Sequence, residues 1–237
     1  MIEDGEVQAV VFDCDGVLLD SNEMKVACFR DAVEAAGFSP GDVERFSTFQ
    51  RANFGTSRFR LFEALLGWDL ERRPLVDRDG LVALYAERLR HLYVAAAATP
   101  DMRAVVGQLA AKLPTYVVSG SDEAELRDVL ATRGDAAMFR LILGSPRTKV
   151  ENLLTLFARP ELVDLPRSAI TFVGDAEADW KAARETGCRF VYMDRFSTVQ
   201  ARMRALAIEE GFPVIEDLRG LPAALGMTQP EDGSPAC

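Results

Sequence analysis

The chain contains few of the residues from which several common active sites are built. Its 237 residues include one histidine, His91, and four cysteines whose spacing forms no pairs. The cysteine pattern argues against a disulfide framework and against a zinc site. His91 lies in a helical Ala/Leu/Arg stretch and would have to act as a lone base. Cys14 alternates with two aspartates, which directs its side chain into the core, so we interpret both residues as structural.

Excess basic charge and long apolar runs are also missing. The formal net charge is −10, and no basic stripe is interleaved with aromatic residues, so a nucleic acid would be repelled on average. No apolar stretch reaches the roughly 18 residues that span a bilayer, and residues 1–4 lack the basic start of a signal peptide. We expect a cytoplasmic protein without nucleic-acid or membrane partners, although a few local positive groups could still hold a small anion.

What the sequence does contain is a repeated pattern of short apolar strands followed by helices. The strand-like runs cover 7–12, 115–118, 140–143, 169–173, 189–193 and 213–215. Between the first and the second of these runs, from about 21 to 98, only helical patterns occur. This alternation predicts an α/β protein with a Rossmann-like parallel sheet. We expect a core from residues 1–20 and 99–225, a small all-helical cap at 21–98 inserted after the first strand, and a disordered tail at 226–237.

Two acids follow the first predicted strand directly. Asp13 and Asp15 are separated by one residue and followed by Gly16. In open α/β sheets ligands bind at the carboxyl ends of the strands, and two carboxylates this close repel unless they share a positive ion such as a hard divalent cation. A solvated turn explains these residues about equally well on their own. A calcium-binding loop fits less well, because no closing glutamate follows.

Polar residues also stand at three later strand ends. Ser119 and Gly120 follow a β-rich run without the Gly-x-Ser-x-Gly pattern of a nucleophile elbow, and a helix cap is the alternative interpretation. Lys149 begins a helix, where its charge opposes the helix dipole unless an anion lies nearby; a solvated lysine is the alternative. Asp175 and Asp179 are four residues apart at another helix start, where the dipole favours acids in any case. Four such signals at successive strand ends are hard to explain by chance.

In this order and spacing the chain resembles the haloacid dehalogenase superfamily of aspartate-nucleophile phosphotransferases. The motifs are Asp13-x-Asp15-Gly16-Val17-x-x-Asp20-Ser21, Ser119 after an apolar strand, Lys149, and Gly174-Asp175-x-x-x-Asp179. The resemblance extends to about Leu225. Members of its phosphoglycolate phosphatase and β-phosphoglucomutase branch carry a small helical cap between the first two motifs, where the helical insertion lies here.

The resemblance implies a set of roles. Asp13 would be the nucleophile that forms an aspartyl-phosphate, and Asp15 the acid and base. The Asp13 carboxylate, the Asp15 backbone carbonyl and Asp175 would hold Mg²⁺. Ser119, Gly120 and Lys149 would bind the phosphoryl oxygens, and Asp179 would orient Lys149 or a metal-bound water.

The chain departs from the family pattern at several places. Many relatives have a proline after the lysine, whereas Val150 follows Lys149, so Arg147 is the fallback for this role. Ala176 stands where Ser or Thr is common. True dehalogenases lack the second aspartate, so Asp15 argues against carbon–halogen hydrolysis. Phosphonate-cleaving relatives form an imine on a cap lysine; Lys25, the one lysine of the insertion, lies early in its first helix, which disfavours that chemistry.

Specificity is expected from the cap. Arg51, Asn53 and Arg58 surround Gly55, which separates two predicted helices, and such a loop could close on an anionic or hydroxylated substrate. Arginines on a solvated helix face are the equally common alternative.

These observations predict a Mg²⁺-dependent phosphatase acting on a small phosphorylated metabolite of the sugar or sugar-acid phosphate class. A phosphomutase of the β-phosphoglucomutase type is the alternative within the family. A catalytically silent binding or regulatory protein on the same fold is the alternative from another class. The sequence indicates no particular oligomeric state.

Overall fold

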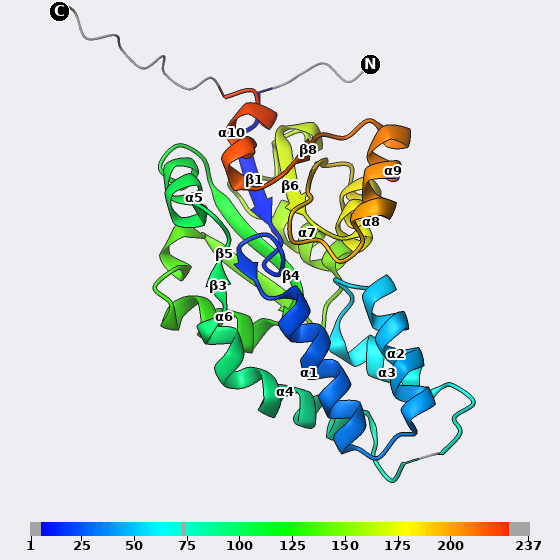
Figure 1. Cartoon of the computed structure of the whole chain (residues 1–237). Helices are drawn as coiled ribbons and strands as arrows, with labels where there is room; N and C mark the ends of the chain where they lie inside the picture. Colours follow the sequence, from blue (N-terminus) through cyan, green and yellow to red (C-terminus); the bar gives the residue numbers. More distant parts are fainter. Residues whose placement is uncertain (1–5, 73, 228–237) are drawn as a thin grey trace, which may run out of the picture.

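A parallel sheet of six strands forms the centre of the computed structural model shown in Figure 1, which describes residues 6–72 and 74–227. The strand order is β5-β4-β1-β6-β7-β8, and every pairing is parallel. The strands are β1 (Ala9–Phe12), β4 (Thr115–Asp122), β5 (Leu141–Ser145), β6 (Ile170–Gly174), β7 (Arg189–Met193) and β8 (Val214–Ile215). Strand β1 lies between β4 and β6. The chain first adds β4 and β5 on one side of β1 and then adds β6, β7 and β8 on its other side, so the strand order reverses at β1.

Both faces of the sheet are covered by helices. Successive residues of a strand point to opposite faces, and all four residues of β1 are fully buried. Val10 and Phe12 belong to the apolar cluster that includes α5 (Met102–Ala110) and α6 (Glu123–Thr132). Ala9 and Val11 belong to the cluster on the other face. That cluster includes α7 (Lys149–Phe157), α8 (Glu177–Thr186) and α9 (Gln200–Glu210). Burial on both faces explains why these strands read as continuous apolar runs.

Four helices follow one another between two short antiparallel strands, β2 (Leu19–Asp20) and β3 (Ala97–Ala98). They are α1 (Asn22–Ala35), α2 (Pro40–Ala52), α3 (Arg58–Leu66) and α4 (Arg78–Ala95), and we call them the cap. In Figure 1 they lie together beyond the lower end of the sheet. An aromatic cluster holds them: the Phe29 ring lies 4.1 Å from Tyr85 and 5.3 Å from Phe62, centroid to centroid. Such pairs contribute roughly 0.5–1.5 kcal/mol each beyond their buried area.

The α/β class and the helical insertion after the first strand are therefore confirmed, and the differences are local. β4 continues to Asp122 instead of ending at 118, because its last residues still pair with β5 at Ser145. The short helix α10 (Leu221–Ala224) and α9 were not predicted. The exact cap boundaries stay a prediction, and most of the tail predicted at 226–237 lies outside the described residues.

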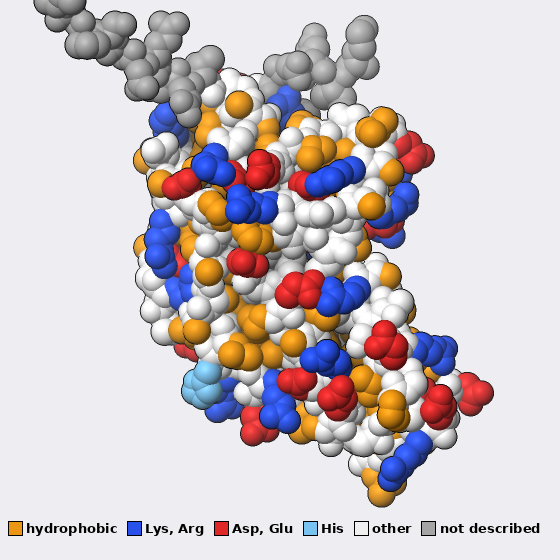
Figure 2. All heavy atoms as spheres, in the orientation of Figure 1, with side chains coloured by type: hydrophobic (Ala, Val, Ile, Leu, Met, Phe, Trp, Pro, Cys, Tyr) orange, Lys and Arg blue, Asp and Glu red, His pale blue; other side chains and the backbone are white. Residues whose placement is uncertain are grey.

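The surface mixes charges of both signs. Lys and Arg side chains are interspersed with Asp and Glu on the face shown in Figure 2, where no continuous basic stripe is visible. His91 is exposed on α4. Within the described ranges, no helix combines the length and apolar character needed to cross a membrane.

Candidate active site

Three strand ends bring the predicted site residues together. Asp13 follows the last residue of β1, and Asp175 follows the last residue of β6, which pairs with β1. Ser119 lies in β4, the other neighbour of β1. The carboxyl ends of parallel strands at a reversal of strand order form the usual ligand-binding crevice of open α/β sheets.

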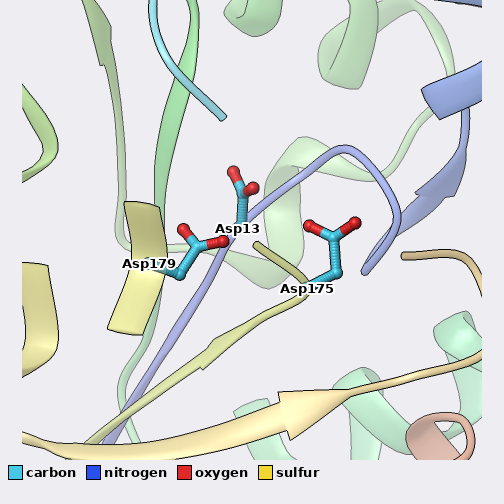
Figure 3. Close-up of side chains that lie close together, drawn as sticks. All are labelled: Asp13, Asp175 and Asp179. Atoms are coloured by element: carbon cyan, nitrogen blue, oxygen red, sulfur yellow. The ribbon is translucent and has the colours of Figure 1, made fainter. Parts of the chain in front are cut away.

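Three buried carboxylates meet at this crevice. Figure 3 shows Asp13, Asp175 and Asp179 around a common space, and an oxygen of each lies within 4.8 Å of the others. Burial raises the pKa of Asp13 to about 7; the charge of Lys149 opposes this rise, and the charges of Asp179 and Asp15 add to it. Burial, with the charges of Asp179 and Asp13, also raises the pKa of Asp175 well above its ordinary value. The cluster therefore has more negative charge than its protein neighbours balance.

The donor set fits a hard cation. Oδ1 of Asp175 is buried and has no hydrogen-bond partner among the described residues, while Oδ2 accepts a hydrogen bond of 2.6 Å from Nδ2 of Asn22. Oδ1 of Asn22 is also buried without a partner in the described part of the chain. Buried polar atoms are nearly always paired, so these two oxygens are available to accept a cation or a water molecule. Carboxylate and carbonyl oxygens are what Mg²⁺ prefers.

Lys149 is the lysine that contacts the nucleophile candidate Asp13. Its Nζ donates to Oδ2 of Asp13 at 2.9 Å and also donates to Oδ1 of Asp179. Burial would lower the pKa of Lys149, but the charges and hydrogen bonds of Asp13 and Asp179 raise it above its ordinary value. Thr148 caps α7 with the help of Glu151, and this cap fixes the turn from which Lys149 extends. Arg147, the fallback from the sequence, is exposed and donates to Asn152 and Glu123 instead.

Asp15 has a separate hydrogen-bond environment. Its Oδ1 accepts from Ser21 Oγ at 2.6 Å, and its Oδ2 accepts from Lys25 Nζ at 2.7 Å and from Ser121 Oγ at 2.8 Å. Burial alone would raise the pKa of Asp15, but the charge of Lys25 and these three hydrogen bonds together lower it. The pKa of Asp13 is thus raised and that of Asp15 is lowered, and such opposite shifts are typical of carboxylates with different roles.

A small cavity, about 30 Å³ in volume, lies between the strand ends and the cap. From the core, Asp13, Asp15, Ser119, Gly120 and Ser121 line it, and the cap contributes Lys25, Gln50, Phe54, Arg58 and Tyr85 among others. Its volume is close to that of one water molecule in the liquid. The cap therefore stands closed over the acids.

The three cap residues predicted from the sequence lie in different surroundings. Arg58 is buried, lines the cavity and donates to Glu125 of the core at 2.8 and 3.0 Å. Arg51 donates to Glu23 of α1, and Asn53 donates to the Phe49 carbonyl. The side chains of Arg51 and Asn53 are exposed and do not line this cavity.

Sequence reasoning did not include four residues that the structure brings to the site: Asn22, Lys25, Gln50 and Ser121. Asn22 and Lys25 lie on the buried face of α1. Gln50 is 1% exposed, on the face of α2 that also buries Val43 and Phe46, and its Oε1 has no partner in the described part of the chain. A polar residue in register with the apolar positions of a helix was the available signal. Lys25 was considered from the sequence only for imine chemistry, which its early position disfavours; the structure places its side chain against Asp15.

Known proteins share this architecture. A phosphoglycolate phosphatase of Neisseria gonorrhoeae is 27% identical over 187 residues, which cover 77% of this chain and 78% of that protein. The structure of CbbY from Rhodobacter sphaeroides in complex with phosphate matches with a TM-score of 0.72 at 16% identity, over 93% of this chain and 99% of that one. The HAD-hydrolase YfnB from Bacillus subtilis, bound to magnesium, matches with a TM-score of 0.64 at 16% identity, over 94% and 100% of the two chains.

Structural likeness at such identities establishes a common fold. Membership follows from the sequence itself, because a family model described as haloacid dehalogenase-like hydrolase matches residues 7–187. That span contains the cap and every predicted site residue. The chain belongs to the haloacid dehalogenase-like hydrolase family.

Proposed function

We propose that the protein is a Mg²⁺-dependent phosphatase that hydrolyses a small phosphorylated metabolite through an aspartyl-phosphate on Asp13. The observation that carries the proposal is the position of the Asp13 carboxylate, which contacts Lys149 at 2.9 Å and has an oxygen within 4.8 Å of an oxygen of Asp175. An anionic nucleophile can approach a phosphate dianion only where positive charge offsets the repulsion.

Asp13 and Asp15 would carry out the first half of the reaction. A carboxylate oxygen of Asp13 attacks phosphorus, and the bond from phosphorus to the leaving oxygen breaks. Asp15, which carries the proton taken from the attacking water of the preceding turnover, gives that proton to the leaving oxygen, so the leaving group departs as an alcohol. Lys149 and the backbone N–H groups near Ser119 and Gly120 hold the phosphoryl oxygens during the transfer.

Water completes the second half. The Asp15 carboxylate takes a proton from a water molecule whose oxygen attacks phosphorus, and the bond from phosphorus to Asp13 breaks. Orthophosphate and the free Asp13 carboxylate result. Asp179 keeps Lys149 directed at Asp13 throughout, because its Oδ1 accepts from Lys149 and its Oδ2 accepts from the Ala176 N–H at 3.0 Å.

Asp13, Asp175 and the backbone carbonyl of Asp15 would hold the Mg²⁺ ion. When bound, the ion would offset the negative charge of the phosphoryl group and of the acid cluster. The magnesium-bound neighbour of the same fold supports this choice of metal, as does the oxygen-only donor set.

The cavity lining supports a sugar or sugar-acid phosphate as the substrate class. Beyond the acids, the cap presents the cations Lys25 and Arg58 and the amide of Gln50, next to the aromatic rings of Phe54 and Tyr85. Such a lining suits a small leaving group with hydroxyl or carboxylate substituents. A curated relative is a phosphoglycolate phosphatase, and a neighbour of the same fold binds phosphate.

A panel of phosphomonoesters assayed with Mg²⁺, against Asp13→Asn as the control, tests the proposal. We expect hydrolysis of at least one sugar or sugar-acid phosphate, and a loss of at least about 10⁴-fold in Asp13→Asn, because the amide is a far poorer nucleophile. Mass spectrometry of the quenched wild-type enzyme should find phosphate on Asp13. A panel without turnover would end the phosphatase proposal. Stimulation by a bisphosphate primer would favour the phosphomutase alternative.

A further inference from the structure

Lys25 is a cap residue whose ammonium group lies inside the active site. Its Nζ is 2.7 Å from Oδ2 of Asp15, 2.6 Å from Oγ of Ser121 and 3.7 Å from the centroid of the Tyr93 ring. The residue is only 4% exposed. A buried lysine with this set of partners is held in one position, because each donor direction meets an acceptor or the face of a ring.

These contacts join the cap to the core. Lys25 belongs to α1 and Tyr93 to α4, both in the cap, whereas Asp15 follows β1 and Ser121 lies in β4. The Tyr93 hydroxyl lies 3.4 Å from Ser121 Oγ and donates to Cys14 Sγ at 3.4 Å. Other buried contacts also join the cap to the core: Arg58 donates to Glu125, and Asn22 donates to Asp175. Among the described residues of α1–α4, Lys25 is the one that hydrogen-bonds Asp15 directly.

The orientation of Asp15 depends on three donors. Ser21 holds Oδ1, and Lys25 together with Ser121 holds Oδ2. Lys25 is the one charged donor of the three, and charge-assisted hydrogen bonds are roughly twice as strong as neutral ones. Ser121 Oγ is in turn held between Lys25 and Asp15. Loss of the ammonium would remove the strongest restraint on the carboxylate and one restraint on the serine.

We propose that Lys25 is a positioning residue that sets the orientation of Asp15 for proton transfer to the leaving oxygen once the cap closes. This inference rests on the proposed phosphatase function. In the step concerned, the phosphorus bond to Asp13 forms and the bond to the leaving oxygen breaks. The proton that Asp15 took from the attacking water in the preceding turnover goes to the leaving oxygen. Lys25 exchanges no proton with the substrate. The role proposed here is non-covalent, through the 2.7 Å ion pair with Asp15, and involves no imine.

The test compares two leaving groups. An alkoxide needs a proton in order to depart, whereas p-nitrophenolate departs as a stable anion. For Lys25→Met we expect kcat/KM to fall by about 100-fold with the best alkyl phosphate of the panel and by less than about 5-fold with p-nitrophenyl phosphate. In an Asp15→Asn background, Lys25→Met should change kcat/KM by less than about 3-fold, because residues that act as a unit are not additive.

Two further variants keep the test decisive. Lys112→Met removes an exposed lysine of the core and should leave both rates unchanged. If Lys25→Met does not fold, as judged by its melting curve, Lys25→Gln keeps a shorter, uncharged donor and should show the same split between the substrates. Two results would overturn the proposal and leave the phosphatase function standing. One is an equal fall in kcat/KM with both substrates. The other is a fall of about 100-fold when Lys25→Met is added to Asp15→Asn. If the wild type hydrolyses neither ester, the proposed function itself fails. A covalent bond between Lys25 and a carbonyl substrate after reduction with borohydride would also overturn the positioning role of Lys25.

Discussion

The acid cluster depends on neighbouring residues that leave room for it. Gly16 has a φ of +76°, and a Cβ there would lie 2.2 Å from Oδ2 of Asp175 and 2.4 Å from Nδ2 of Asn22. Both atoms belong to the pair that orients the Asp175 carboxylate. The glycine of the first motif is therefore needed for its close approach to Asp175 and Asn22 as well as for its backbone conformation.

Gly16→Ala should weaken Mg²⁺ binding by at least about 10-fold, because the methyl group would displace the Asp175 carboxylate. Isothermal titration with Mg²⁺ measures this directly. Gly211→Ala is the matched control: Gly211 has a φ of +77°, and a Cβ there meets nothing within 4 Å. The control should lose only the roughly 1–2 kcal/mol of stability that a left-handed backbone costs, with unchanged Mg²⁺ affinity. Equal Mg²⁺ affinity in both variants would contradict the prediction.

Single residues also show how far sequence reasoning reaches. Asp13, Asp15, Asp175 and Lys149 stand at strand ends or helix starts, so local pattern and topology alone predict that they meet. Lys25 does not follow such a rule. Its role depends on the direction in which α1 leaves the core and on the length of a flexible side chain, and both are decided by packing across the cap. Sequence pattern could only have indicated that a lysine shares the apolar face of the helix.

The loop between α2 and α3 packs tightly against the core. A Cβ on Gly120 of β4 would lie 2.4 Å from the carbonyl oxygen of Gly55 in this loop. A Cβ on Gly55 would meet the Cβ atoms of Ala176 and Ala178 and the Nζ of Lys149, each at 3.3 Å. Ala176, which departs from the family pattern, thus lies where the cap loop packs. Small side chains on both elements let the backbone of the loop reach the carboxyl end of β4.

Gly120→Ala should separate this loop from β4 and lower kcat/KM by about 100-fold, since a displacement near 1 Å can cost that much. Steady-state kinetics on the best substrate measures the loss. Gly107→Ala in α5 is the control, because a Cβ at that position meets nothing within 4 Å and alanine favours a helix. Unchanged kinetics in Gly120→Ala would show that the contact does not matter for the reaction.

Elements were easier to predict from the sequence than their contacts. The strands were found because parallel strands buried on both faces are continuous apolar runs. The helix α9 was not predicted: Met203, Leu206 and Ala207 form a narrow apolar stripe among charged residues, and its burial depends on the sheet. The contact between the cap loop and β4 joins residues 55 and 120, and no local pattern encodes that separation.

At the scale of the whole molecule, the acid cluster links stability to pH and to metal. The pKa of Asp13 is raised to about 7 and that of Asp175 is also raised. A carboxyl with a raised folded-state pKa contributes stability at low pH, and this contribution is lost as the pH rises through the folded-state value. The metal-free protein should therefore lose stability between about pH 5 and pH 8, and a divalent cation should restore it.

Thermal unfolding in EDTA should show a melting temperature about 5 °C lower at pH 8 than at pH 5.5, since a loss on the order of 1–3 kcal/mol moves a chain of this size by several degrees. Added Mg²⁺ should raise the melting temperature more at pH 8 than at pH 5.5. Asp13→Asn should flatten the dependence in EDTA. A melting temperature that rises with pH over this interval in EDTA would contradict the argument.

The cavity above Asp13 is about 30 Å³, too small to admit a phosphomonoester while the loop at Gly55 rests on Gly120. We therefore expect part of the cap to move away from the strand ends before an ester reaches Asp13, and to move again before orthophosphate leaves. The rate of such a movement depends on the viscosity of the solvent. In sucrose solutions kcat should fall nearly in proportion to the relative viscosity if this movement limits turnover, and a flat response would assign the slow step to the chemistry beneath the cap.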